Sequence, residues 1–160
     1  NKLGIHLIVE SHLPKTYLDG AAMLLTDGSP VIALTLRYDR IDHFWFSLLH
    51  ELAHVRLHLR NADDCFLDDL EITVKDIGED NPEKEADRLA EEAVIPSRFW
   101  EEKILRTTTT AEQVQVWADE LKIHQALIIG RIRYHTGNYR LLSRYLGAGS
   151  VCSQFIKSCH

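Results

Sequence analysis

The fold of this 160-residue chain is decided by His50-Glu51-Leu52-Ala53-His54, a stretch with the pattern H-E-x-x-H. Residues four apart share one face of a helix, so the rings of His50 and His54 can reach a single metal ion. Glu51 lies beside the first histidine, where its carboxylate can hold a water molecule against that ion. Two neutral nitrogen ligands and a nearby base are the groups with which a protein-bound zinc ion activates water.

The surrounding residues predict one continuous helix over residues 42–60. Asp42 is a good N-cap, and no Pro or Gly interrupts the chain from there to Leu59. Apolar residues recur at helical spacing, at Phe46, Leu49, Ala53 and Leu57. This context disfavours the alternative that the two histidines are surface residues of a solvated helix.

A third metal ligand has to come from elsewhere in the chain. In metzincins a Gly and a further His follow the motif, but Leu57 and Arg60 occupy those positions here. A Glu from a later helix is the other common solution. The segment 81–95 predicts that helix, because Asn81 is a good N-cap and Pro82 suits the first helical position.

Glu85 is the predicted third ligand on this second helix. It lies at the edge of an apolar stripe formed by Ala86, Leu89, Ala90 and Ala93. A carboxylate at that edge is costly to bury unless a positive group lies against it, and a zinc ion is such a group. If Glu85 proves dispensable for zinc binding, Glu83 or Glu92 is expected to take its place.

These residues resemble the ImmA/IrrE family of zinc metallopeptidases, whose domain is often found C-terminal to helix-turn-helix regulators. The resemblance extends over nearly the whole chain and is carried by residues 18–22, 32–37, 42–46, 50–58, 85–90, 95–96 and 123–131. It implies a zinc cofactor with His50, His54 and Glu85 as ligands. It also implies that Glu51 is the general base.

Two further side chains are expected to hydrogen-bond to the ligands rather than to bind the ion. His58 lies one turn beyond His54, roughly 6 Å farther along the helix axis, which is too far for the same ion. Asp87 lies on the second helix, at a position where the resembled family often has Asn. Candidate donors to the oxyanion of the reaction are Tyr38, His43, His58, Arg131 and His135.

Composition narrows the classes of function. The net charge is −6 and no long basic tract is present, which argues against general nucleic-acid binding by this chain itself. No apolar run approaches membrane-spanning length, so no membrane partner is expected. The three cysteines lack the spacing of a disulfide framework or a zinc knuckle, which favours a reducing cytoplasm.

The expected fold class is α+β, with a small antiparallel β-sheet packed on a helical core that bears the H-E-x-x-H helix, as in zincins and gluzincins. Asp27-Gly28 between apolar segments predicts a hairpin within a sheet of three strands. One metallopeptidase-like domain is expected over residues 1–145. Its β-hairpin region is expected at residues 1–40 and its C-terminal helices at residues 97–136. Residues 61–80 are expected to be mostly loop with a short strand at 71–75, and residues 146–160 to form a flexible tail.

The residues together predict a zinc-dependent metalloendopeptidase that hydrolyses a peptide bond in a protein partner. The resemblance implies that this partner is a transcriptional repressor, and that any nucleic acid is bound by a domain absent from this chain. The alternative is a non-catalytic, antitoxin-like module that binds a metal or an effector and regulates a helix-turn-helix transcription factor. Glu51 favours the enzyme, because a purely structural metal site needs no base beside it.

Overall fold

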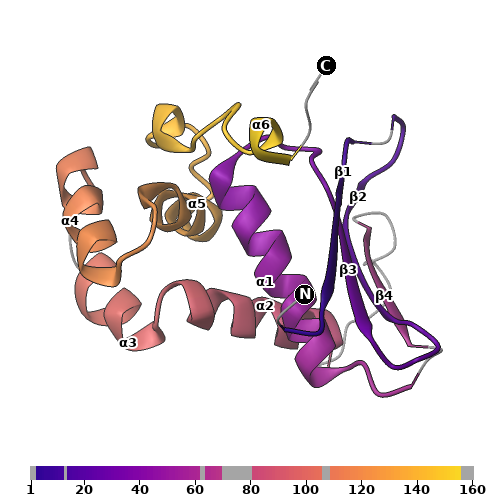
Figure 1. Cartoon of the computed structure of the whole chain (residues 1–160). Helices are drawn as coiled ribbons and strands as arrows, with labels where there is room; N and C mark the ends of the chain where they lie inside the picture. Colours follow the sequence, from indigo (N-terminus) through magenta and orange to yellow (C-terminus); the bar gives the residue numbers. More distant parts are fainter. Residues whose placement is uncertain (1–2, 13, 62–63, 70–80, 106–108, 156–160) are drawn as a thin grey trace.

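A four-stranded sheet packs against one side of a central helix, and most of the other helices gather on its opposite side (Figure 1). The computed structural model describes residues 3–12, 14–61, 64–69, 81–105 and 109–155. The strands are β1 His6–Glu10, β2 Leu18–Leu24, β3 Pro30–Thr35 and β4 Cys65–Asp69. The helical segments are α1 Ile41–Leu57, α2 Pro82–Val94, α3 Ser97–Phe99, the π-helix η2 Trp100–Ile104, α4 Ala111–Leu121, α5 Gln125–Thr136, the 3-10 helix η3 Ser143–Tyr145 and α6 Cys152–Phe155. The expected α+β class is confirmed.

The sheet is mixed rather than purely antiparallel. Its order is β1-β3-β2-β4, and β2 runs antiparallel to both of its neighbours. The predicted turn at Asp27-Gly28 joins β2 to β3, and Gly28 adopts a φ of +82°. One expectation was wrong, because β1 pairs parallel to β3. The sheet also gains a fourth strand, β4, inside the segment expected to be mostly loop, whereas the short strand expected at 71–75 lies outside the described residues. Strand order and direction follow from tertiary packing, which local alternation does not encode.

Helix α1 carries the H-E-x-x-H stretch, as predicted, and ends at Leu57, three residues early. Its N-cap is Arg40, which makes no side-chain capping hydrogen bond, so the prediction of Asp42 as N-cap was wrong. Asp42 lies in the first turn and accepts two hydrogen bonds from Arg40, at 3.0 and 2.6 Å. Phe44 of α1 packs on Ile32 of the sheet, which fixes the helix against β3.

Helix α2 begins where the sequence predicts, and side-chain caps mark the starts of both α2 and α4. The Asn81 side chain accepts a hydrogen bond from Glu83 N, and Thr110 accepts one from Gln113 N. A second apolar core joins the end of α2 to α4 and α5, with Val114, Ile128 and Ile129 completely buried. Helix α5 also packs directly on α1, the helix that carries the metal-binding stretch (Figure 1).

Part of the expected flexible tail packs on the domain. Val151 and Cys152 are buried, and the backbone N–H groups of both donate to Asp39 Oδ1. Cys65 is a free thiol, whereas Cys152 is disulfide-bonded, which weakens the cysteine argument for a reducing compartment. Within the part of the chain that the structure describes, no helix is both long and apolar enough to cross a membrane.

Candidate metal centre and cleft

Three side chains from two helices converge at one point. His50 and His54 extend from the same face of α1, and their Nε2 atoms lie 3.0 Å apart. Glu83, in the first turn of α2, brings its Oε2 to 3.0 Å from His50 Nε2 and 3.3 Å from His54 Nε2. Both histidines are buried, and Glu83 is about one quarter exposed (27%). Among the described residues, this trio is the group that could hold a metal ion.

Glu83 is prepared to act as an anionic ligand at neutral pH. Burial by itself would raise the pKa of its carboxyl group, but hydrogen bonding to His50 and His54 outweighs this effect and lowers the pKa to about 2. A carboxylate that stays ionised keeps its lone pairs available to a cation. The pair of imidazoles beside it supplies the neutral nitrogen donors.

The separations within this trio fit a tetrahedral zinc ion. Zinc takes nitrogen and oxygen ligands at about 2.0–2.2 Å, so two tetrahedral ligands lie roughly 3.3 Å from each other. The three observed separations are 3.0, 3.0 and 3.3 Å. Three protein ligands also match the number found in catalytic zinc sites, which keep the fourth position open.

The structure does not bring Glu85, the predicted third ligand, to the motif histidines. Glu85 Oε2 instead lies 3.1 Å from His58 Nε2, and its side chain is 64% exposed. The prediction failed because it misjudged which face of α2 is buried. Residues Ala86, Ala90 and Val94 form that face, whereas Ala93 is exposed. Two residues span about 200° of a helix, so Glu83 and Glu85 point to opposite sides.

The outer nitrogens of both motif histidines have hydrogen-bond partners. His50 Nδ1 lies 2.9 Å from Asp87 Oδ1, and His54 Nδ1 lies 3.0 Å from His58 Nδ1. With Nδ1 protonated, His50 donates to Asp87, and His54 donates to His58, which in turn donates from Nε2 to Glu85. In this tautomer, the one that binding of an ion would require, the Nε2 lone pairs face the ion in place of the Nε2–H groups that hydrogen-bond to Glu83. Asp87 and His58 thus lie where hydrogen-bonding partners of the ligands were expected.

Substitution of Asp87 by Ala is expected to weaken zinc binding by about 10- to 100-fold, because His50 loses the acceptor that fixes its tautomer and ring orientation. Competition with a chelator of known affinity measures the change. Asp119→Ala, on the exposed face of α4, removes the same group far from the trio and should leave the affinity unaltered. Equal affinities for the Asp87 variant and the wild type would show that this hydrogen bond is unimportant.

Glu51 lies on the sheet side of α1 and is completely buried. The backbone of β2 approaches it closely at Gly20: a Cβ atom placed there would lie 2.9 Å from both Cδ and Cγ of Glu51. Only glycine leaves this space, so Gly20 allows the strand to pack directly on the carboxylate. No local pattern indicates this contact, because it joins residues 31 positions apart in the sequence.

Substitution of Gly20 by Ala is expected to lower peptidase activity by about 100-fold or more while zinc remains bound, because the added methyl group displaces the Glu51 carboxylate. Steady-state cleavage rates and zinc content of the same preparation test this. Retained zinc and an unchanged far-UV circular dichroism spectrum of the Gly20 variant would show that the fold survives the added methyl group. Unchanged cleavage by the Gly20 variant would contradict the proposed importance of this approach.

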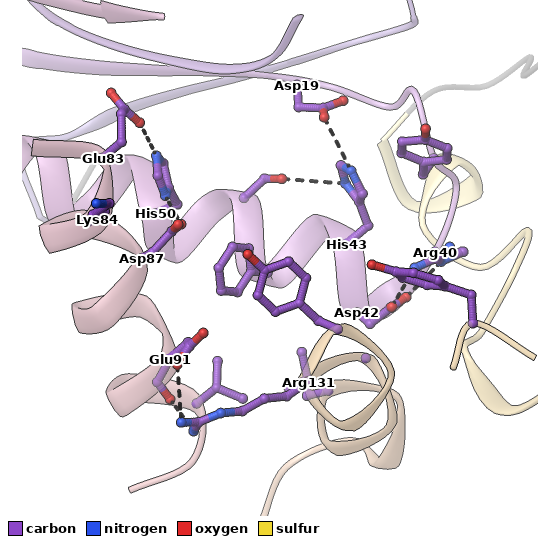
Figure 2. Close-up of a pocket in the computed structure, with 18 of the residues that line it drawn as sticks. Asp19, Arg40, Asp42, His43, His50, Glu83, Lys84, Asp87, Glu91 and Arg131 are labelled. Carbon is purple, nitrogen blue, oxygen red and sulfur yellow. Dashed lines mark hydrogen bonds and ion pairs between the residues drawn. The ribbon is translucent and has the colours of Figure 1, made fainter. Parts of the chain in front are cut away.

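A cavity of about 630 Å³ adjoins the trio and extends along α1 toward its N-terminus. Figure 2 shows His50, Glu83 and Asp87 at one end, and Arg40 and Asp42 at the other. Tyr38, His43 and Arg131 line the cavity, whereas His58 and His135 do not. Tyr134, which the sequence analysis did not single out, lines it as well. The cavity can therefore receive an elongated ligand that starts at the metal-binding trio.

Comparison with known proteins identifies the family. A search of curated proteins found no match to the chain. A family model described as the IrrE N-terminal-like domain, Peptidase M78, matches residues 1–127. The match includes the sheet, both helices of the trio and the first residues of α5. The resemblance noted in the sequence is confirmed: this chain belongs to the IrrE N-terminal-like, M78 peptidase family.

Proposed function

We propose that this chain is a zinc-dependent metalloendopeptidase that hydrolyses a peptide bond in a protein partner. The observation that carries the proposal is the meeting of His50, His54 and Glu83 beside a cavity that His50 and Glu83 line. A structural metal site would be closed on all sides by protein ligands, whereas three ligands beside a cavity leave room for water and substrate. Membership of a peptidase family supports the same function.

Each group of the site has a distinct task in this reaction. His50, His54 and Glu83 hold the ion, and Asp87 keeps His50 in the tautomer that binds it. Zinc, when bound, lowers the pKa of a water molecule to roughly 7 and polarises the carbonyl to be attacked. Glu51 accepts the proton of that water as the peptide bond is attacked. It then transfers the proton to the leaving amine.

The proposed partner is a transcriptional repressor, and the support for it is the family resemblance. Because this chain is acidic, DNA binding would come from another domain or another protein. A repressor is met in the compartment that holds the DNA, so this function places the chain in the cytoplasm.

Incubation with the helix-turn-helix repressor encoded nearest to this gene, and in parallel with a mixed peptide library, tests the function. Mass spectrometry should find new chain ends that require zinc, disappear with a chelator and return when zinc is restored. A protein that binds zinc but cuts neither the repressor nor any library peptide would contradict the proposal. It would instead favour the non-catalytic, metal-binding regulatory module.

A further inference from the structure

We propose that the cavity beside the metal site receives a basic side chain, Lys or Arg, of the substrate and that Asp19 selects it. The inference rests on the proposed peptidase function and adds a substrate class to it. The carboxylate of Asp19 lies on the sheet side of the cavity, opposite Glu91 and Arg131 (Figure 2).

Local backbone geometry directs Asp19 into the cavity wall. The β2–β4 register shifts between Leu18 and Gly20, which leaves Asp19 as the extra residue of a β-bulge. Bulges re-aim side chains at the margins of sheets and beside active sites. This one removes Asp19 from the regular alternation of β2 and places its carboxylate next to His43 of α1.

The Asp19 carboxylate is incompletely satisfied. Its side chain is only 8% exposed, and its Oδ2 lies 3.5 Å from both His43 Nε2 and Arg37 Nη1. Its Oδ1 is buried and accepts no hydrogen bond from the described residues. An unpaired buried acceptor is unfavourable, so a donor supplied by a ligand would be bound tightly. Because χ2 of Asp is broad, a small rotation can turn either oxygen toward the cavity.

The other charges of the cavity favour a cation over an anion. Its lining includes the carboxylates of Asp19, Asp42, Glu83, Asp87 and Glu91 but only three Lys or Arg side chains, Arg40, Lys84 and Arg131. Both arginines are engaged within the protein. Arg40 donates twice to Asp42, and Arg131 donates to Glu91 Oε2 and to the backbone carbonyl of Ile95. They therefore offer little to an anionic ligand. Arg37 pairs with Asp19 through Oδ2 and leaves Oδ1 without a donor among the described residues.

The apolar and aromatic residues that line the rest of the cavity suit the methylene groups of a long basic side chain. Phe46 of α1 and Tyr134 of α5 line the cavity and are well exposed, with Val94 and Leu127 nearby. Lys and Arg place their methylene groups against apolar surface and keep the charged end at a polar group. Aromatic faces also attract cations. A basic side chain would thus pack along these residues and end at Asp19.

The position of Asp19 along α1 indicates how far the selected side chain lies from the peptide bond that is cut. Asp19 faces His43, seven residues before His50, which corresponds to about 10 Å along the helix axis. An extended peptide advances roughly 3.3 Å per residue. The selected basic residue is therefore about three positions away from the bond that is cut.

Binding of two small probes tests the inference without requiring cleavage. N-acetyl-arginine amide and its uncharged analogue N-acetyl-citrulline amide are titrated into the zinc-loaded protein and followed by NMR. The arginine probe should bind about tenfold or more tightly than the citrulline probe, as expected for a hydrogen bond to a charged group. In Asp19→Asn this ratio should fall toward one, whereas Asp119→Asn, on α4, should retain it. Equal binding of both probes to the wild type, or an unchanged ratio in Asp19→Asn, would overturn the proposal.

The cut sites in the peptide library provide a second test. They should be enriched in Lys or Arg about three residues from the cleaved bond. If cuts occur without such enrichment and the two probes bind equally, this inference fails while the peptidase function stands. If no peptide is cut, the peptidase function fails, and the probe titration still decides whether the cavity selects a basic group. Should Asp19→Asn fail to fold, equal binding of the two probes by the wild type would still overturn the proposal.

Discussion

Replacement of Glu51 by Gln is expected to reduce peptide cleavage by about 100- to 10,000-fold, the range that a general base contributes. Gln has nearly the same shape as Glu, so it fits the buried space against Gly20. Its amide cannot accept a proton from water. Zinc should remain bound, because Glu51 is not a member of the trio.

Cleavage rates and zinc content, measured on the same preparation, separate the two effects. Glu112→Gln makes the same chemical change on the exposed first turn of α4 and should cleave like the wild type. A Glu51→Gln protein that retains full activity would show that another group, or no protein group, removes the proton.

Substitution of Glu83 by Ala is expected to lower zinc affinity by more than about 100-fold. Loss of a side chain that only hydrogen-bonds to a metal ligand costs up to about 100-fold, and loss of a ligand should cost more. The reason is that the variant leaves only the two histidine ligands. Glu85→Ala is a matched control on the same turn of α2, with the same side chain removed two residues away. It should retain zinc, since Glu85 contacts His58 rather than the trio.

Elemental analysis of dialysed protein measures both variants directly. His54→Ala removes a histidine of the H-E-x-x-H motif, so its zinc content shows what loss of one ligand does. Zinc retained by Glu83→Ala but lost by Glu85→Ala would restore the ligand set predicted from the sequence and contradict the geometry of α2.

The parts of the fold that depend on local interactions could be predicted from the sequence. Asn81 and Pro82 define the start of α2 through a side-chain cap and a fixed φ, both of which act within one turn. The spacing of His50 and His54 brings their rings together on any helix, whatever surrounds it. The H-E-x-x-H helix and two of the three ligands of the metal centre therefore followed from short-range rules.

The identity of the third side chain at the trio could not be predicted in the same way. It depends on how far α2 is rotated about its own axis as it packs on α1. The apolar spacing of Ala86, Leu89, Ala90 and Ala93 fits more than one buried face of the helix, and the prediction selected the wrong one. The four-residue spacing of Glu83, Asp87 and Glu91, a polar row facing the cavity, was the available signal.

Two further features of the site depend on contacts between residues far apart in the sequence and could not be predicted. The approach of Gly20 to Glu51 and the bulge at Asp19 both require β2 to lie across α1, between strands β3 and β4. Alternation within a strand reports which residues share a face but not which strand lies beside it. The cavity wall, and hence the proposed preference for a basic residue, emerges only from that tertiary arrangement.

The most direct test of the metal centre is anomalous diffraction at the zinc edge from crystals grown with zinc. We expect one peak within about 2.0–2.2 Å of His50 Nε2, His54 Nε2 and a carboxylate oxygen of Glu83. A peak bound by Glu85, or no peak at these side chains despite abundant zinc, would contradict the account.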